Sequence, residues 1–231
     1  MVAGARLFES MFDLPYSTAL WISAIATISY VFIGGFLAVS WTDTIEAGLM
    51  IFALLLTPII TLLSFSDLSQ VTLALEAARP QALNLVGDLS WVAINTLKAW
   101  GLGYIGQPHI LVRFMAVDSV KSIPNARRIG MTWMTLCLGG AVAAGFFGIA
   151  YFQQHPELAG VVNANPETVF MELTKILFNP WVAGVVLAAI LAAVMSTLSC
   201  QLLVCSSTLT EDFYKSFLRK NASQNELVWV G

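Results

Sequence analysis

Four long stretches of this 231-residue chain contain no charged residue. They are residues 14–42, 47–66, 129–156 and 176–210. A helix needs roughly 20 apolar residues to cross a bilayer, and each stretch supplies about that number or more. The chain is 58% hydrophobic and 11% charged, whereas a soluble domain is about 45–50% apolar and 25% charged. The pattern therefore predicts an all-α polytopic membrane protein.

A fifth apolar segment completes the predicted arrangement, although it carries Lys98. The five predicted spans are residues 15–40, 46–66, 89–112, 129–152 and 180–210. Both ends of the chain look like parts of further apolar helices. We therefore expect a single membrane domain with ragged ends, the central part of a larger protein whose N- and C-terminal spans are missing here.

The basic residues predict the orientation of these spans. Residues 113–128 hold four basic side chains and residues 211–226 hold three, whereas residues 67–88 and 153–179 hold one each. The positive-inside rule then makes 113–128 and 211–226 cytoplasmic, and 67–88 and 153–179 external. A short turn at Ser40–Glu46 would also face the cytoplasm.

Two asparagine–proline pairs mark helix starts in the second external connection. Asn165 and Asn179 each precede a proline, and asparagine at the N-cap followed by proline favours helix initiation. The sequence thus predicts a short helix from Pro166 to about Leu177 and the start of the fifth span at Pro180.

The third span contains a strong helix-breaking sequence. The stretch Trp100–Pro108 reads WGLGYIGQP, with three glycines and a proline, which disfavour a continuous helix. Inside a bilayer, opened backbone is tolerated only where it is buried in protein or lines a wet cavity. We expect a break near residues 101–108 that marks a solute or ion path. A glycine kink packed against a neighbouring helix is the alternative.

The side chains at this break suit a small solute. Trp100, Tyr104 and Pro108 are spaced four residues apart, which places them on one side of a helix. Aromatic walls suit a partly apolar molecule, and helix-end N–H groups suit a carboxylate. A short amino or imino acid has both properties. Interfacial or packing aromatics are the alternative.

The fifth span has a face of small and hydroxyl-bearing residues. Ala193, Ser196, Thr197 and Cys200 fall together at helical spacing. Hydroxyl and carbonyl oxygens are ligands that a hard cation such as Na⁺ prefers. Tight helix–helix packing is the other common use of such residues. Cys137, Cys200 and Cys205 are interpreted as small buried apolar residues.

Long strings in this chain resemble the sodium/solute symporter family, in particular its bacterial proline-transporting members. They are Trp100–Leu111, Gly34–Asp43, Ala126–Ile129 and Leu191–Ser207. The resemblance implies a leucine-transporter-like fold of two inverted five-helix repeats, of which this chain would form a part.

The resemblance also implies roles for individual residues. Those implied in substrate binding are Trp100, Gly101, Gly103, Tyr104 and Pro108. The backbone carbonyl of Ala193 and the hydroxyls of Ser196 and Thr197 would bind sodium. Asp43 matches an acidic position tied to sodium-dependent function, and we treat it as a coupling candidate.

The expected function is Na⁺-coupled symport of L-proline across the bacterial inner (plasma) membrane. Na⁺ is the coupling ion, and we expect no cofactor, no other metal and no nucleic acid. The alternative is a solute-sensing membrane domain of the same fold. An enzyme is disfavoured, because the sequence shows neither a Walker motif nor paired intramembrane carboxylates.

Overall fold

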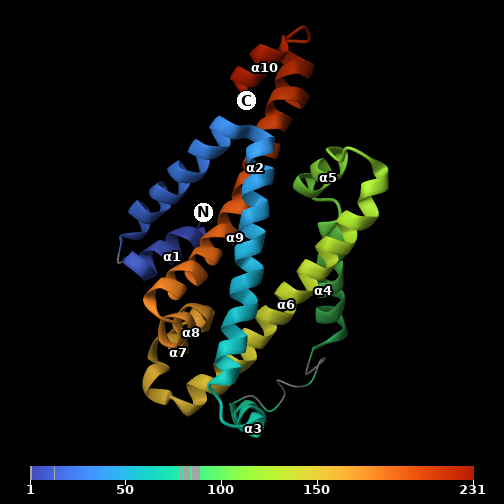
Figure 1. Ribbon diagram of the computed structural model, residues 1–231. Coiled ribbons are helices and arrows are strands. Elements are labelled where there is room, and N and C mark those ends of the chain that lie inside the picture. The colour runs from blue at the N-terminus through green and yellow to red at the C-terminus, as the bar shows by residue number, and fades with distance from the viewer. Residues whose placement is uncertain (1, 13, 79, 81–83, 85–88) are drawn as a thin grey trace. The chain divides into compact units, whose positions relative to one another are not determined.

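The computed structural model describes residues 2–12, 14–78, 80, 84 and 89–231, which contain helices and no strand (Figure 1). Contacts divide the chain into two compact units. Unit 1 consists of Met1–Glu46, Tyr104–Asp118 and Leu191–Gly231. Unit 2 consists of Ala47–Gly103 and Ser119–Ile190.

Unit 1 combines helices that are far apart in the sequence. They are α1 (Val2–Phe12), the first part of α2 (Tyr16–Leu63), α5 (Pro108–Met115), the last part of α9 (Pro180–Ser207), the π-helix η4 (Thr208–Leu218) and α10 (Gln224–Val230). Gly4 brings α1 against α2 and α9, because a Cβ there would lie 3.4 Å from Val194 Cγ1 and 3.5 Å from Ser23 Oγ. The hydroxyl of Tyr214 on η4 donates to Glu226 of α10 at 2.7 Å.

Helix α2 bends sharply at Gly35 (Figure 1). The backbone angles there are φ 55° and ψ −151°, a conformation open almost only to glycine. Residues 40–46 are helical, so the turn predicted at Ser40–Glu46 is wrong. The polar residues of that segment remain compatible with a helix, since Thr44 donates to the Ser40 carbonyl at 2.9 Å. Only glycine supplies the backbone freedom that the bend needs.

The predicted break divides α4 (Trp91–Tyr104) from α5. Gly101 and Gly103 stay helical, and the interruption covers residues 105–107. Proline at 108 has no N–H to give to the Tyr104 carbonyl four residues earlier, and the Gln107 N–H bonds that carbonyl instead at 3.2 Å. Proline rather than glycine thus decides where α4 ends, because single glycines cost a helix only about 1 kcal/mol each.

Unit 2 holds the remaining elements. They are the second part of α2, α3 (Leu68–Ala78), most of α4, the turn η1 (Val120–Ser122), α6 (Ile123–Gln154), η2 (Pro156–Leu158), α7 (Gly160–Ala164), η3 (Pro166–Thr168), α8 (Val169–Leu177) and the first part of α9. Hydrogen bonds from Ser69 to the Asp67 carboxylate cap α3 and lower the pKa of Asp67. Residues 79, 81–83 and 85–88 of the predicted connection 67–88 lie outside the described residues.

Both predicted asparagine caps are confirmed. Asn165 Oδ1 accepts from the Glu167 N–H at 3.2 Å, and Asn179 Oδ1 accepts from the Val182 N–H at 3.1 Å. Each cap satisfies one of the N–H groups that a helix leaves open at its start. The η3–α8 helix and α9 begin at the prolines that follow these caps.

Small residues allow α6 to approach its neighbours closely in unit 2. Gly140, Ala144 and Gly148 are buried on one face of α6. A Cβ at Gly140 would lie 2.3 Å from the Leu54 carbonyl oxygen of α2. A Cβ at Gly148 would lie 2.5 Å from Val169 Cγ2, at the start of α8. Small residues four apart are typical of close helix contacts in membranes.

A second contact fixes the direction of α2 relative to α6 within unit 2. The indole Nε1 of Trp133 donates to the Ala47 carbonyl at 3.0 Å. Trp133 lies seven residues before Gly140, and Ala47 lies seven residues before Leu54. The two helices therefore run parallel here, with the seven-residue repeat of left-handed helix packing.

Three helical stretches among the described residues are long and apolar enough to cross a membrane. They are Gly35–Leu63, Val120–Gln154 and Pro180–Leu218. The bend at Gly35 and the break at residues 105–107 divide the helices of the other two predicted spans into shorter pieces. Large side chains such as Trp41 and Trp181 are 68% and 88% exposed, an apolar surface suited to lipid or to further helices.

The α2–α6 contact predicts a difference between two adjacent glycines. Gly140→Ala forces the α6 backbone away from Leu54, and such overpacking costs about 1–3 kcal/mol. We expect a lower midpoint of thermal unfolding for this variant of the full-length gene product. Gly139→Ala is the matched control, because, beyond the neighbouring backbone of α6 itself, no atom of the described residues lies within 4 Å of a Cβ there. Equal midpoints for the two variants would contradict the contact.

Candidate functional site

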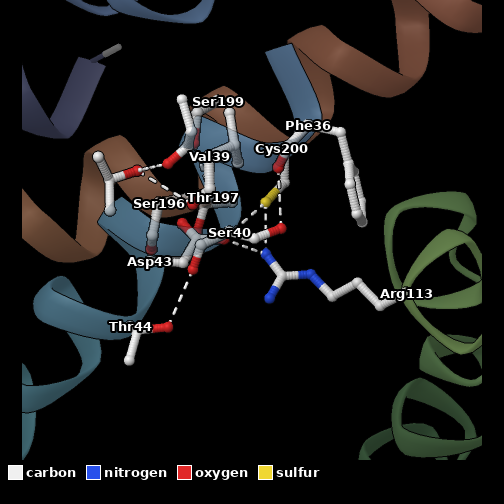
Figure 2. A network of polar contacts seen from close by, with 12 residues as sticks. Phe36, Val39, Ser40, Asp43, Thr44, Arg113, Ser196, Thr197, Ser199 and Cys200 are labelled. Carbon is white, nitrogen blue, oxygen red and sulfur yellow. Dashed lines mark hydrogen bonds and ion pairs between the residues drawn. The ribbon is translucent and has the colours of Figure 1, made fainter. Parts of the chain in front are cut away.

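Three oxygens cluster on the C-terminal part of α9. The Ser196 and Thr197 hydroxyls both donate to the Ala193 carbonyl oxygen, each at 3.2 Å. The cluster lies within unit 1, with Ser196 half-buried and Thr197 exposed. Ser199, three residues after Ser196, is fully buried and donates to the Ser196 carbonyl at 3.0 Å (Figure 2). The sequence-predicted sodium ligands therefore lie within contact of one another.

This cluster has the chemistry of a site for a hard monovalent cation. Neutral oxygens bind such an ion without a fixed charge, at ligand distances of about 2.3–2.6 Å. Oxygens 3.2 Å apart can share one ion at those distances. The two hydroxyl protons now point at the Ala193 carbonyl, so each hydroxyl has to rotate before all three oxygens face a cation. A hydroxyl rotates readily about its C–O bond.

The sequence-predicted substrate residues surround the break between α4 and α5. Tyr104 ends α4, and Pro108 begins α5. The Tyr104 ring packs edge-on against His109, with 6.3 Å between ring centroids. Tyr104 and Pro108 belong to unit 1, which also contains the oxygen cluster of α9.

The other predicted substrate residues lie on the last turns of α4, in unit 2. Trp100 is 72% exposed. Gly101 and Gly103 are also exposed, and apart from adjacent backbone of α4 the described part of the chain places no atom within 4 Å of a Cβ at either. The described residues thus form no closed pocket around these three positions.

A polar network inside unit 1 joins three helices (Figure 2). Asp43 of α2 is 8% exposed. Its Oδ2 accepts a hydrogen bond from Arg113 of α5, which also forms an ion pair with it. The Cys200 thiol of α9 donates to the same oxygen at 3.3 Å, and Arg113 also contacts the Cys200 sulfur. We call Asp43, Arg113 and Cys200 the clasp.

The clasp changes the interpretation of its three members. Asp43 was expected beside a short turn, but it is buried within a helix. Cys200 is buried as predicted but bonded to charged groups, whereas Cys205 is exposed, contrary to its predicted burial. Arg113 was counted only as a cytoplasmic basic residue. The available signal was Asp43 itself, since a charge beside long apolar stretches needs a partner, but sequence spacing cannot show which one.

A hollow lies beside the clasp within unit 1. Residues of α2, α5 and α9 line it, among them Ser40, His109, Arg113 and Cys200. The hollow is therefore lined both by α5, the helix that follows the break, and by α9, the helix that carries the oxygen cluster.

A family model described as "Sodium:solute symporter family" matches residues 1–231. The chain belongs to the sodium:solute symporter family. It is 65% identical over its whole length to the sodium/proline symporter of Escherichia coli (strain K12), covering 46% of that protein. It is 48% identical over its whole length to the high-affinity proline transporter of Bacillus subtilis (strain 168), covering 48% of that protein.

A third relative, the sodium/proline symporter of Haemophilus influenzae, is 61% identical, and the match covers the whole chain and 47% of that protein. The chain spans about half the length of the curated relatives it matches. No solved structure matches it.

Proposed function

We propose that this chain supplies part of the ion and substrate sites of a secondary active transporter that couples Na⁺ entry to L-proline uptake. The supporting observation is that unit 1 contains both the α9 oxygen cluster and the start of α5 after the helix break. The names of relatives up to 65% identical supply the solute and the ion. No catalytic residue is assigned, because binding and conformational change are sufficient for symport.

The proposed fold is the leucine-transporter-like bundle of two inverted repeats, to which this chain contributes five spans. The break at residues 105–107 would be the interruption of a discontinuous helix near the bilayer midplane. Residues 113–128 and 211–226 would face the cytoplasm of a bacterial cell, and 67–88 and 153–179 the outside, as the basic residues indicate.

In the proposed ion site, the Ala193 carbonyl and the hydroxyls of Ser196 and Thr197 bind Na⁺. Each hydroxyl oxygen lies 3.2 Å from the Ala193 carbonyl oxygen, which supports a shared ion. Because these ligands are neutral, they hold Na⁺ weakly enough to release it, which a transport cycle requires.

In the proposed substrate site, Trp100 and Tyr104 cover the apolar ring of proline. The N–H groups opened at the break donate hydrogen bonds to its carboxylate, and Gly101, Gly103 and Pro108 shape the backbone around it. Na⁺ on α9 would favour the conformation in which this site is formed. By thermodynamic reciprocity, proline then tightens Na⁺ binding by the factor with which Na⁺ tightens proline binding.

Uptake of labelled L-proline by the full-length gene product in proteoliposomes tests this function. We expect an inward Na⁺ gradient to drive accumulation above equilibrium and a K⁺ gradient of equal size to drive none. Proline binding without accumulation under a Na⁺ gradient would contradict transport and favour a sensing role.

The ion site predicts the effect of removing single hydroxyls. Ser196→Ala and Thr197→Ala each remove one charge–dipole interaction of about 1.5–3 kcal/mol. We expect the Na⁺ concentration for half-maximal uptake to rise roughly 10- to 100-fold, at about 1.4 kcal/mol per factor of ten.

Ser207→Ala is the matched control for these variants. Ser207 lies on the same helix, is exposed and makes no capping hydrogen bond through its side chain. Its Na⁺ dependence should match that of the wild type. An unchanged Na⁺ requirement in both the Ser196 and Thr197 variants would exclude this face of α9 as the ion site.

A further inference from the structure

The clasp connects the two helices that the proposed function assigns to proline and to Na⁺. Arg113 lies on α5, Cys200 lies on α9, and both meet at one carboxylate oxygen of Asp43 on α2 (Figure 2). All three residues belong to unit 1. The contact is therefore made within unit 1, although Arg113 and Cys200 lie 70 and 157 residues from Asp43 in the sequence.

Helix α5 is short enough to move as a rigid rod. It has eight residues, with Pro108 at its first position and Arg113 in its last turn. Arg113 lies five positions after Pro108, or about 7.5 Å further along the helix axis. A displacement of α5 at the break is therefore carried to Arg113 and to the hydrogen bonds that Arg113 makes.

The other end of the clasp lies close to the proposed Na⁺ ligands. Cys200 follows Ser196 by four residues and Thr197 by three, so it lies one helical turn along the same face of α9. The Cys200 thiol is 7% exposed and bonded to Asp43. A shift of the Asp43 carboxylate therefore moves the Cys200 side chain on α9, one turn from the oxygen cluster.

The electrostatics of Asp43 make Arg113 hard to replace. Asp43 Oδ1 is buried and has no hydrogen-bond partner among the described residues, and the same is true of Glu46 Oε2, three residues along α2. Among the described residues, Arg113 and Cys200 donate to Oδ2 of Asp43, and the nearby Glu46 carboxyl also interacts with the Asp43 carboxylate. The Arg113 side chain is half exposed, but the Asp43 side chain is buried. Removing Arg113 therefore leaves a buried carboxylate without its cationic partner, which is strongly unfavourable.

We propose that Arg113 is a coupling residue, which transmits the position of α5 to the Na⁺-binding part of α9 through Asp43 and Cys200. The inference rests on the proposed function of Na⁺-coupled proline transport. Proline at the break sets the position of α5, and the clasp then holds α2 and α9 in the arrangement that binds Na⁺. Without the clasp, both ligands still bind, but each loses its effect on the affinity of the other.

The coupling factor measures this directly. It is the ratio of proline dissociation constants without and with saturating Na⁺, measured by equilibrium binding of labelled L-proline to the purified full-length gene product. Allosteric coupling is typically 5- to 150-fold. We expect Arg113→Met and Asp43→Asn each to bring the factor close to one, while proline affinity without Na⁺ changes less than threefold.

Two further variants separate the clasp from general effects of charge and folding. Arg113→Lys keeps the positive charge but loses the planar fork of donors, so its coupling factor should fall between those of the wild type and Arg113→Met. Arg128→Met is the matched control, because Arg128 is an exposed basic residue of α6 with no hydrogen bond to the clasp. Its coupling factor should equal that of the wild type.

Reactivity of the Cys200 thiol reports whether the clasp is open, provided that the variant is folded. Proline binding without Na⁺, retained within threefold, shows that the variant is folded. In a background in which Cys137, Cys205 and every further cysteine of the full-length gene product are replaced by serine, maleimide labelling reports Cys200 alone. We expect Arg113→Met, at a temperature well below its unfolding transition, to label at least fivefold faster than the parent without proline. If Arg113→Met does not fold, Arg113→Lys should still show faster labelling and a reduced coupling factor.

The outcomes distinguish the clasp from the proposed function. A wild-type coupling factor of one would refute Na⁺-coupled transport. A large wild-type factor that persists unchanged in the Arg113 and Asp43 variants would overturn the clasp alone. Loss of coupling in Arg128→Met as well would also overturn it, because the effect would then not depend on the Asp43 contact.

Discussion

Backbone hydrogen bonding is the constraint on which this structure depends. Inside a bilayer an opened N–H or C=O group has no water to bind, so a helix is interrupted only where the protein can use or satisfy the opening. Among the described residues of the predicted spans, two such interruptions occur, at Gly35 and at residues 105–107. Both lie in segments that belong to unit 1, the same unit that carries the oxygen cluster and the clasp. Irregular backbone, neutral oxygens and an ion pair with a buried carboxylate are thus gathered in one part of the molecule.

Different kinds of contact hold the helices together inside each of the two units. In unit 2, close packing of Gly140 and Gly148 on α6 excludes side chains at the contact, which favours one fixed arrangement. In unit 1, polar contacts such as Asp43–Arg113 join the helices. A polar contact breaks and re-forms with a small movement, whereas an interlocked backbone contact does not. The polar contacts within unit 1 are accordingly suited to conformational change, and the glycine contacts within unit 2 to a fixed arrangement.

The sequence predicted features that arise from local chemistry. Proline at 108 and the asparagine caps at 165 and 179 act through their own backbone neighbours, so the break and the helix starts follow from a few residues. The bend at Gly35 was missed because the more polar segment that follows it was interpreted as the turn. The Arg113–Asp43 pair spans 70 residues, and no local spacing indicates it. The α9 hydroxyl face was predicted from helical periodicity, and the structure adds that its oxygens share one acceptor.

The most direct test of this account is an experimental structure of the full-length protein with Na⁺ and L-proline bound. The account predicts Na⁺ at about 2.4 Å from the Ala193 carbonyl and from the Ser196 and Thr197 hydroxyls, with the hydroxyls rotated away from that carbonyl. It predicts proline against Tyr104 at the break. Sodium bound by other residues, with the two hydroxyls still donating to Ala193, would contradict it.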